Sequence, residues 1–211
     1  MYEGKPIIGI AGGIGSGKSF IAKLFVEDGC MVISSDEIVR QAYKDPIIKA
    51  QLKKWWGLMV FSPDGEIDRA SVARKIFSKV EERRRLEQLL HPYANQVRER
   101  MMQEAAKDPQ IKAFVWDTPL LFETGLDRLC DKLVYVDAPQ EMRLNRVHEV
   151  RGWGPAALQE REKLQLPLDK KREMSDYVIT NTADADSARG QVRDTLSRIL
   201  AETQQQPAPS R

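Results

Sequence analysis

One octapeptide near the start of the chain carries residue types that bind phosphate groups. It reads Gly12-Gly13-Ile14-Gly15-Ser16-Gly17-Lys18-Ser19 and matches the pattern Gly-x-x-x-x-Gly-Lys-Ser/Thr. Glycines let backbone N–H groups converge on phosphate oxygens, and the N-terminus of a following helix adds partial positive charge. Lys18 is expected to reach the β- and γ-phosphates, and the Ser19 hydroxyl to bind Mg²⁺. Residues Gly13 to Ser19 therefore predict a site for a nucleoside triphosphate.

The segments around this loop predict the elements that must position it. Residues 7–11 form an apolar run typical of a buried parallel strand, and residues 18–27 repeat apolar side chains at helical spacing. Asp28-Gly29 ends that helix, and residues 30–33 predict a second buried strand. Strand, phosphate loop, helix and strand open a βαβ unit, in which the strands run parallel.

Further strands are expected over residues 113–117, 132–137 and 177–180, with a final amphipathic helix over 185–202. The fold class is therefore predicted as α/β, a P-loop kinase with a three-layer core and a parallel five-stranded sheet. A single domain is expected over 5–203, with a nucleotide core (about 5–36, 110–140 and 172–203), a helical insertion of about four helices (37–109) and a lid (141–171). The Gln- and Pro-rich residues 204–211 are predicted to be a disordered tail.

Composition limits the classes of partner. The net charge is only +2, so neither nucleic acid nor a membrane surface is expected as a partner. The two cysteines have no metal-ligand spacing, and no leader or membrane-spanning run is visible. These features favour a cytoplasmic protein that is a monomer or a small homo-oligomer.

Three classes of P-loop protein compete. A regulatory GTPase normally carries an Asn-Lys-x-Asp tetrapeptide, which the sequence lacks. A motor ATPase usually has a strong acidic strand end, for which Asp117 is a weak candidate. A short chain, a helical insertion and an arginine-rich lid are typical of small-molecule kinases. An ATP-dependent kinase is therefore the leading hypothesis, with a nucleotide or nucleoside kinase and a nucleotide-binding switch as alternatives.

A more specific resemblance follows the order of several motifs. These motifs are the phosphate loop, Asp36, His91-Pro92, Pro119-Leu120-Leu121-Phe122-Glu123, residues 133–137, Arg146, Arg151, Arg161 with Gln165, and residues 176–181. Their order along the chain resembles that of the dephospho-CoA kinase family. The resemblance spans roughly residues 7–200. It implies transfer of the γ-phosphate of ATP, with Mg²⁺, to the ribose 3′-hydroxyl of dephospho-CoA, the last step of coenzyme A biosynthesis. It also implies that the helical insertion binds the acceptor.

Two acidic residues each have two interpretations. Asp36 follows the second strand, where a carboxylate can accept a proton from an attacking hydroxyl, and the resemblance implies that it is the catalytic base. The alternative is that Asp36 caps a helix beginning at Glu37. Asp117 ends the third strand and can hold Mg²⁺ through water, although a capping role is the favoured interpretation.

The resemblance also implies roles for residues of the acceptor site and the lid. His91, Pro119, Leu120, Leu121 and Arg161 are expected at the acceptor site, although His91 also fits a helix junction and the leucines also fit a core. Arg146 is expected to stabilise the transferring phosphoryl group together with Lys18, and Asn181 to lie where the adenine binds. Trp153 either stacks on a base or packs against a helix.

Two positions depart from the family pattern. Ala11 stands directly before the loop, where the family usually has threonine or serine. Ser34 stands where the family has the first aspartate of Asp-Ala-Asp, and only Asp36 remains. Both departures leave Asp36, the residue that the implied mechanism needs, in place.

Overall fold

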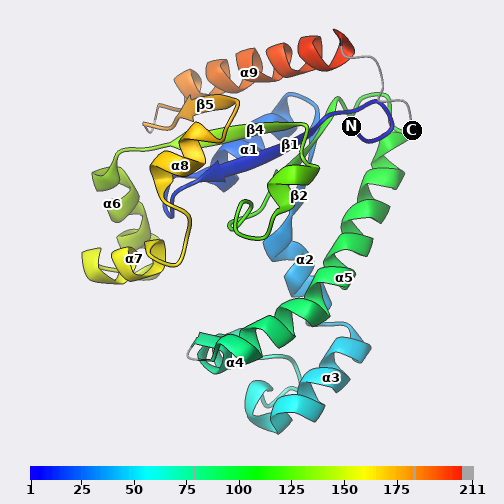
Figure 1. The fold of residues 1–211 in the computed structure, drawn as a ribbon, viewed down its shortest axis with the longest axis vertical. Helices are drawn as coiled ribbons and strands as arrows, with labels where there is room; N and C mark the ends of the chain where they lie inside the picture. The colour runs from blue at the N-terminus through cyan, green and yellow to red at the C-terminus, as the bar shows by residue number, and fades with distance from the viewer. Residues whose placement is uncertain (78, 183, 206–211) are drawn as a thin grey trace. The chain divides into compact units, whose positions relative to one another are not determined.

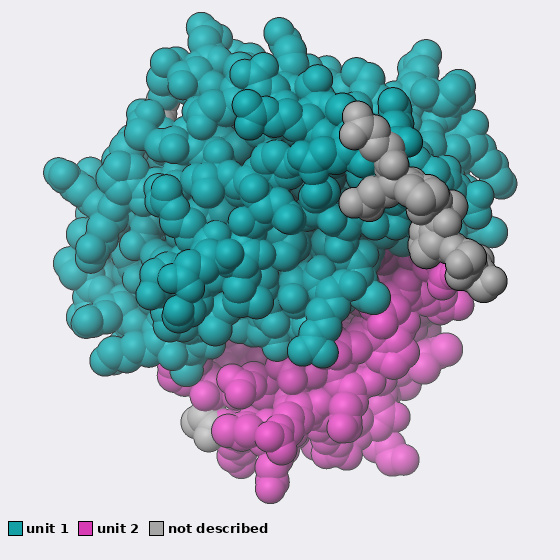
Figure 2. Space-filling model, turned by 45° about the horizontal axis from the view of Figure 1, so that its top comes forward, with its two compact units in different colours: residues 1–33, 102–211 teal, residues 34–101 magenta. Residues whose placement is uncertain are grey.

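The computed structural model describes residues 1–77, 79–182 and 184–205. The chain divides into two compact units (Figure 2). Unit 1 comprises residues 1–33 and 102–211, and unit 2 comprises residues 34–101. The part of the predicted tail at 206–211 lies outside the described residues, whereas residues 204 and 205 continue the last helix.

Unit 1 is built on a five-stranded sheet of order β2-β3-β1-β4-β5 (Figure 1). The strands are β1 (Ile7–Gly12), β2 (Cys30–Ser34), β3 (Ala113–Asp117), β4 (Lys132–Asp137) and β5 (Tyr177–Thr180). β1 pairs in parallel with both β3 and β4, and β4 pairs in parallel with β5. The predicted parallel sheet is thereby confirmed, with the loop-bearing strand at its centre.

Two of the helices that follow these strands match predicted segments, and three others lie largely in the region predicted as the lid. In chain order these helices are α1 (Lys18–Glu27), α6 (Gln140–Arg151), α7 (Pro155–Glu162), α8 (Leu168–Glu173) and α9 (Ala185–Gln205). Gly152 has a φ of 66° and closes α6, as glycine commonly does at a helix end. No helix within the described residues is both long and apolar enough to cross a membrane.

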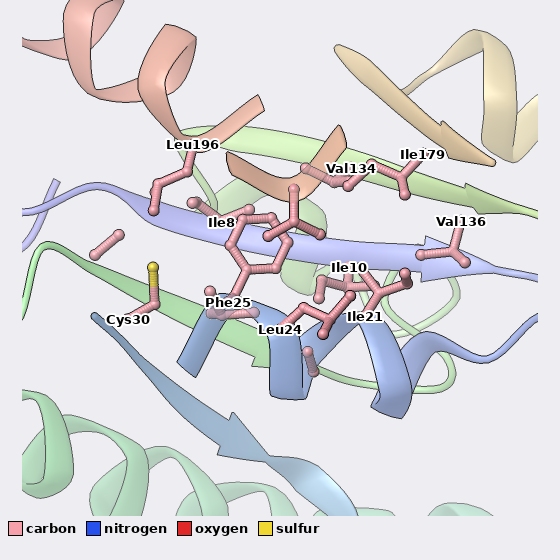
Figure 3. Packing of buried hydrophobic residues seen from close by; sticks show 14 of the residues in the cluster. Ile8, Ile10, Ile21, Leu24, Phe25, Cys30, Val134, Val136, Ile179 and Leu196 are labelled. Carbon is pink, nitrogen blue, oxygen red and sulfur yellow. The ribbon is translucent and has the colours of Figure 1, made fainter. Parts of the chain in front are cut away.

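One face of the sheet carries the main core of unit 1. Ile8 and Ile10 of β1 pack with Phe25 of α1 and with Val192 of α9, all fully buried (Figure 3). Side chains alternate between the two faces of a strand, so β1 turns its even-numbered residues towards α1 and α9. Burial of such residues stabilises the fold by roughly 1.5–3 kcal/mol per large side chain.

The opposite face is covered by the segment after β3, including the 3₁₀ helix η2 (Leu126–Leu129), and by α8. Ala11 packs there against Leu121 and Tyr135. A Cβ on Gly9 would lie 2.7 Å from Leu121 Cδ2, so only glycine allows this close approach. Ala11, which lacks the hydroxyl that the family usually has at this position, therefore makes apolar contacts in a second, smaller core.

Unit 2 contains α2 (Ser35–Ala42), α3 (Pro46–Trp56), η1 (Gly57–Val60), α4 (Arg69–Phe77) and most of α5 (Val80–Ala106). Its own hydrophobic core includes Leu52, Trp56 and Val72. Asp45 caps α3 by accepting hydrogen bonds from the N–H groups of Ile47 and Ile48, and Pro46 occupies the first helical turn. The expected four helices are thus present.

Candidate active site

The phosphate loop joins β1 to α1, and glycines hold its conformation at two points. Gly15 and Gly17 have φ values of 78° and 87°, in the left-handed region that side chains disfavour. A Cβ on Gly17 would lie 2.2 Å from Asn181 Nδ2, and a Cβ on Gly15 would lie 2.5 Å from the carbonyl oxygen of Arg143. The loop therefore packs tightly against α6 and the segment after β5.

Arg146 and Asn181 bind the carbonyl groups of this loop. Arg146 Nη1 donates to the carbonyl oxygens of Ser16 (3.2 Å) and Gly15 (3.4 Å), and Asn181 Nδ2 donates to that of Ser16 (2.8 Å). Arg146 Nη2 also reaches the carbonyl oxygen of Asn181 at 3.2 Å. In a planar trans peptide the N–H group points away from the C=O group, so these bonds turn the N–H of Gly17 the other way. They leave the N–H group of Gly17 available for an anion.

Arg146 and Asn181 both lie against the phosphate loop. Both were expected at the nucleotide, and the structure brings both to the loop, but their polar groups are occupied by the loop and by each other. Asn181 is buried, so its side chain supports the loop rather than facing solvent. Their contacts with nucleotide stay predictions.

Lys18 lies at the start of α1 with its ammonium group over the loop. Lys18 Nζ donates to the carbonyl oxygens of Gly12 and Gly13, each at 3.0 Å. Removal from water lowers the pKa of Lys18 from 10.5 to about 8, against the attraction of Asp117, and the positive charges of Lys171 and Arg151 lower it further. Because burial disfavours the charged form of Lys18, an anionic ligand beside it would stabilise that charge.

Ser19 and Asp117 meet at the adjoining ends of α1 and β3. Ser19 Oγ donates to Asp117 Oδ2 at 2.8 Å, and Asp117 is buried. A hydroxyl and a carboxylate are the oxygen ligands that suit Mg²⁺, which usually takes few protein groups in addition to phosphate and water. The residues therefore fit the ion. The favoured capping interpretation of Asp117 is wrong in so far as its carboxylate binds the loop serine.

Arg143 is a further loop contact, at a position where the sequence favoured a solvated helix face over a functional role. Its Nη1 donates to the carbonyl oxygen of Ile14 at 3.3 Å and pairs with the carboxylate of Glu162 on α7. The side chain is buried, one helical turn before Arg146. The spacing of three between the two arginines was the available signal, because it places both on one face of α6.

Arg151 and Arg161 share one aromatic ring. Their guanidinium carbons lie 4.7 Å and 3.9 Å from the ring centroid of Trp153. Arg161 Nη1 also donates to the carbonyl oxygen of Ala157 at 2.8 Å. Cation–π contacts hold both side chains at the connection between α6 and α7. Trp153 thus stacks on arginine, an interpretation that the sequence did not offer.

The Pro119–Glu123 segment divides between surface and core. Pro119 and Leu120 are exposed, and these two residues remain candidates for the acceptor site. Leu121 is 1% exposed and packs with Ala11 and Tyr135, so its side chain serves the core and is not available to a ligand as placed.

Asp36 and His91 belong to unit 2. The helix α2 begins at Ser35, and its N-cap is Ser34, whose Oγ accepts from the N–H of Glu37 at 3.4 Å. The capping interpretation of Asp36 is therefore wrong, and the departure at Ser34 supplies the cap. His91 is exposed within α5, which continues through Pro92, so the helix-junction interpretation is also wrong. The catalytic role of Asp36 and the acceptor role of His91 stay predictions.

The fold and the loop together define the class of P-loop kinases of small molecules. Similarity to solved structures supports this class. A protein of Thermus thermophilus, TT1252, matches with a TM-score of 0.79 and 31% identity, over 94% of this chain and 97% of that one. A shikimate kinase from Acinetobacter baumannii shares the fold with a TM-score of 0.52 and 19% identity, over 95% and 96%.

Sequence comparisons identify the family. The family model described as dephospho-CoA kinase matches residues 6–187. Dephospho-CoA kinases of Syntrophotalea carbinolica and Corynebacterium glutamicum are each 34% identical over 92% of this chain, covering 92% and 97% of their own lengths. The chain belongs to the dephospho-CoA kinase family. The activity that goes with this membership is the last step of coenzyme A biosynthesis.

Proposed function

We propose that this chain transfers the γ-phosphoryl group of ATP to the ribose 3′-hydroxyl of dephospho-CoA. The 3′-oxygen forms a bond to the γ-phosphorus, the bond from that phosphorus to the β–γ bridging oxygen breaks, and ADP leaves. The hydroxyl proton passes to a carboxylate and then to water. The products are coenzyme A and ADP.

The phosphate loop supplies the donor site in this proposal. Arg146 and Asn181 bind loop carbonyls and so orient N–H groups that would receive phosphate oxygens. Lys18, whose ammonium group now rests on two carbonyls, moves its hydrogen bonds to the β- and γ-phosphates. Preorganised donors of this kind stabilise charge that develops in the transition state.

Mg²⁺ would be held by the Ser19 hydroxyl and, directly or through water, by Asp117. When bound, the ion neutralises charge on the β- and γ-phosphates. The two protein groups already lie within hydrogen-bond distance of each other, which supports a shared ion.

Asp36 is the proposed base. Its carboxylate is exposed and comes two residues after the end of β2, and ligands of open α/β sheets bind beyond the carboxyl ends of the strands. His91, Pro119, Leu120 and Arg161 are proposed to contact the acceptor.

The observation that carries the proposal is the family match over residues 6–187, joined to the contact between Ser19 and Asp117. The test incubates the purified protein with MgATP and a panel of acceptors: dephospho-CoA, AMP, CMP and adenosine. We expect ADP formation with dephospho-CoA well above the others. Phosphorylation of a nucleoside or nucleotide without turnover of dephospho-CoA would favour a nucleotide kinase, and binding without any turnover would favour a switch.

We further expect the protein to act in the cytoplasm as a monomer or a small homo-oligomer. Both described cysteines are free thiols, as a reducing compartment allows. Sedimentation with and without ATP would measure the oligomeric state.

A further inference from the structure

An ion pair between a buried lysine and a partly exposed glutamate joins the segment after β3 to helix α8. Lys171 is 1% exposed, and its Nζ lies 2.8 Å from Glu123 Oε1. The same Nζ donates to Gln165 Oε1 at 3.0 Å. Burying a lysine is costly unless the charge is paired and hydrogen bonded. Both conditions are met here, because Glu123 pairs with the ammonium group and Gln165 accepts a hydrogen bond from it.

Glu123 connects this pair to two backbone segments. Its Oε1 also accepts from the N–H of Leu166 at 2.8 Å, which fixes the chain just before α8. On the other side, the hydroxyl and the N–H of Thr124 donate to the carbonyl oxygen of Leu120, at 2.7 Å and 3.0 Å. Leu120, Glu123 and Thr124 thus belong to one hydrogen-bonded turn. Glu123 therefore connects Lys171 and Leu166 to the turn that contains Leu120.

The pair also lies beside the phosphate loop. Leu168, in the first turn of α8, packs close enough to Gly13 that a Cβ there would lie 3.3 Å from either of its methyl carbons. The charges of Lys171 and Glu123 both act on Lys18, the first lowering and the second raising its pKa. Helix α8 is therefore in contact with the loop while it holds the Leu120 turn.

We propose that Lys171 is a positioning residue for the acceptor, holding the Pro119–Glu123 segment in place through Glu123. The proposal rests on the proposed function, because it takes Pro119 and Leu120 as acceptor contacts. Lys171 itself touches no reacting atom in this account. Its pairing with Glu123 fixes the turn whose exposed end meets dephospho-CoA, and α8 carries that position to the phosphate loop.

The test separates positioning from stability with one single and one double substitution. Lys171→Met leaves the Glu123 carboxylate, whose side chain is 18% exposed, without its cation, so Tm should fall. Adding Glu123→Met removes that unpaired charge, and we expect Tm to recover most of the loss. The double variant still lacks the bonds from Glu123 to Lys171 and to the N–H of Leu166, which join the turn to α8. Its KM for dephospho-CoA should stay raised by about tenfold, with the KM for ATP unchanged.

Lys170→Met is the matched control, because Lys170 is the exposed neighbour of Lys171 on α8 and its ammonium group pairs with Glu173 on the helix surface. It should leave both KM values and Tm unchanged. A double variant with wild-type KM for dephospho-CoA would overturn the proposal, and so would equal rises in both KM values.

A second measurement needs no catalysis. Amide hydrogen exchange at Thr124 and Gly125 should be faster in the double variant than in the wild type, because their N–H groups donate within the Leu120 turn. If wild-type protein fails to phosphorylate dephospho-CoA, the proposed function is wrong, and this exchange experiment still decides whether Lys171 holds the turn. Unchanged exchange would overturn the positioning role.

Discussion

The charged candidate site residues of unit 1 and those of the helical unit 2 differ in their exposure. In unit 1, Asp117, Arg143 and Lys171 are buried, and each has a partner within the phosphate loop, the lid or the segment after β3. In unit 2, Asp36 and His91 are exposed. Buried, paired charges fix a geometry before any ligand arrives, whereas exposed ones are placed by the ligand. We therefore expect the donor site to be preorganised and the proposed acceptor groups of unit 2 to be positioned by the ligand.

The largest effect should come from removing the cation of the donor side. Lys18→Ala should reduce kcat/KM by about 10³-fold and also weaken ATP binding, because it removes a preorganised charge at the phosphates. Steady-state kinetics and calorimetric titration with ATP would measure the two losses. Lys23→Ala, on the exposed face of the same helix, should change neither. Retention of ATP affinity in Lys18→Ala would contradict a preformed donor site.

The next effect concerns the exposed carboxylate of unit 2. Asp36→Asn keeps the size of the side chain and removes the base, so kcat should fall by about 10²- to 10⁴-fold with little change in ATP affinity. The adjacent Glu37→Gln is the control, because Glu37 pairs with Arg40 on the helix surface. If Asp36→Asn turned over like the wild type, Asp36 would have no catalytic role.

A smaller effect is expected behind the phosphate loop. Arg146→Lys keeps the charge but cannot reproduce bonds from two nitrogens to Ser16 and Asn181, so we expect about a tenfold loss in kcat/KM. Arg193→Lys, on an exposed side chain of α9, is the control. Comparison of the ATP affinity of the two variants would show whether the loss arises in the donor site. An unchanged kcat/KM in Arg146→Lys would show that Arg146 has no role in the donor site.

The smallest effect is a change in protonation. With a pKa of about 8, Lys18 is partly neutral at pH 8.5, and triphosphate oxygens favour its charged form, so ATP binding should take up a fraction of a proton. Calorimetry in two buffers of different ionisation enthalpy would measure it. Lys18→Arg should bind without uptake, because arginine stays charged at this pH. Equal uptake in that variant would assign the proton to another group.

The same lowered pKa affects the ligand-free protein. Between about pH 8 and 10.5 the unfolded chain binds more protons at Lys18 than the folded chain does. The contribution of Lys18 to the free energy of unfolding therefore rises with pH through that window. ATP should reduce this dependence, because it restores the proton to Lys18.

Local patterns predicted most of the fold. Apolar runs and glycines placed all five strands and the helix Lys18–Glu27, because each signal lies within a few neighbouring residues. The sequence missed contacts that join distant segments, such as Ser19 with Asp117 and Lys171 with Glu123. No local spacing encodes these pairs, since the strand order of the sheet brings them together. The start of α2 at Ser35 was missed because two serines both fit a helix cap.

The central claim is phosphorylation of the ribose 3′-hydroxyl, and the chemical position of the new phosphate tests it most directly. The product of wild-type protein, MgATP and dephospho-CoA would be purified and examined by ³¹P–¹H correlation NMR. We predict a new phosphomonoester coupled to the 3′-proton of the ribose. A phosphate at the 2′-position, or recovery of dephospho-CoA unchanged while another acceptor is phosphorylated, would contradict the account.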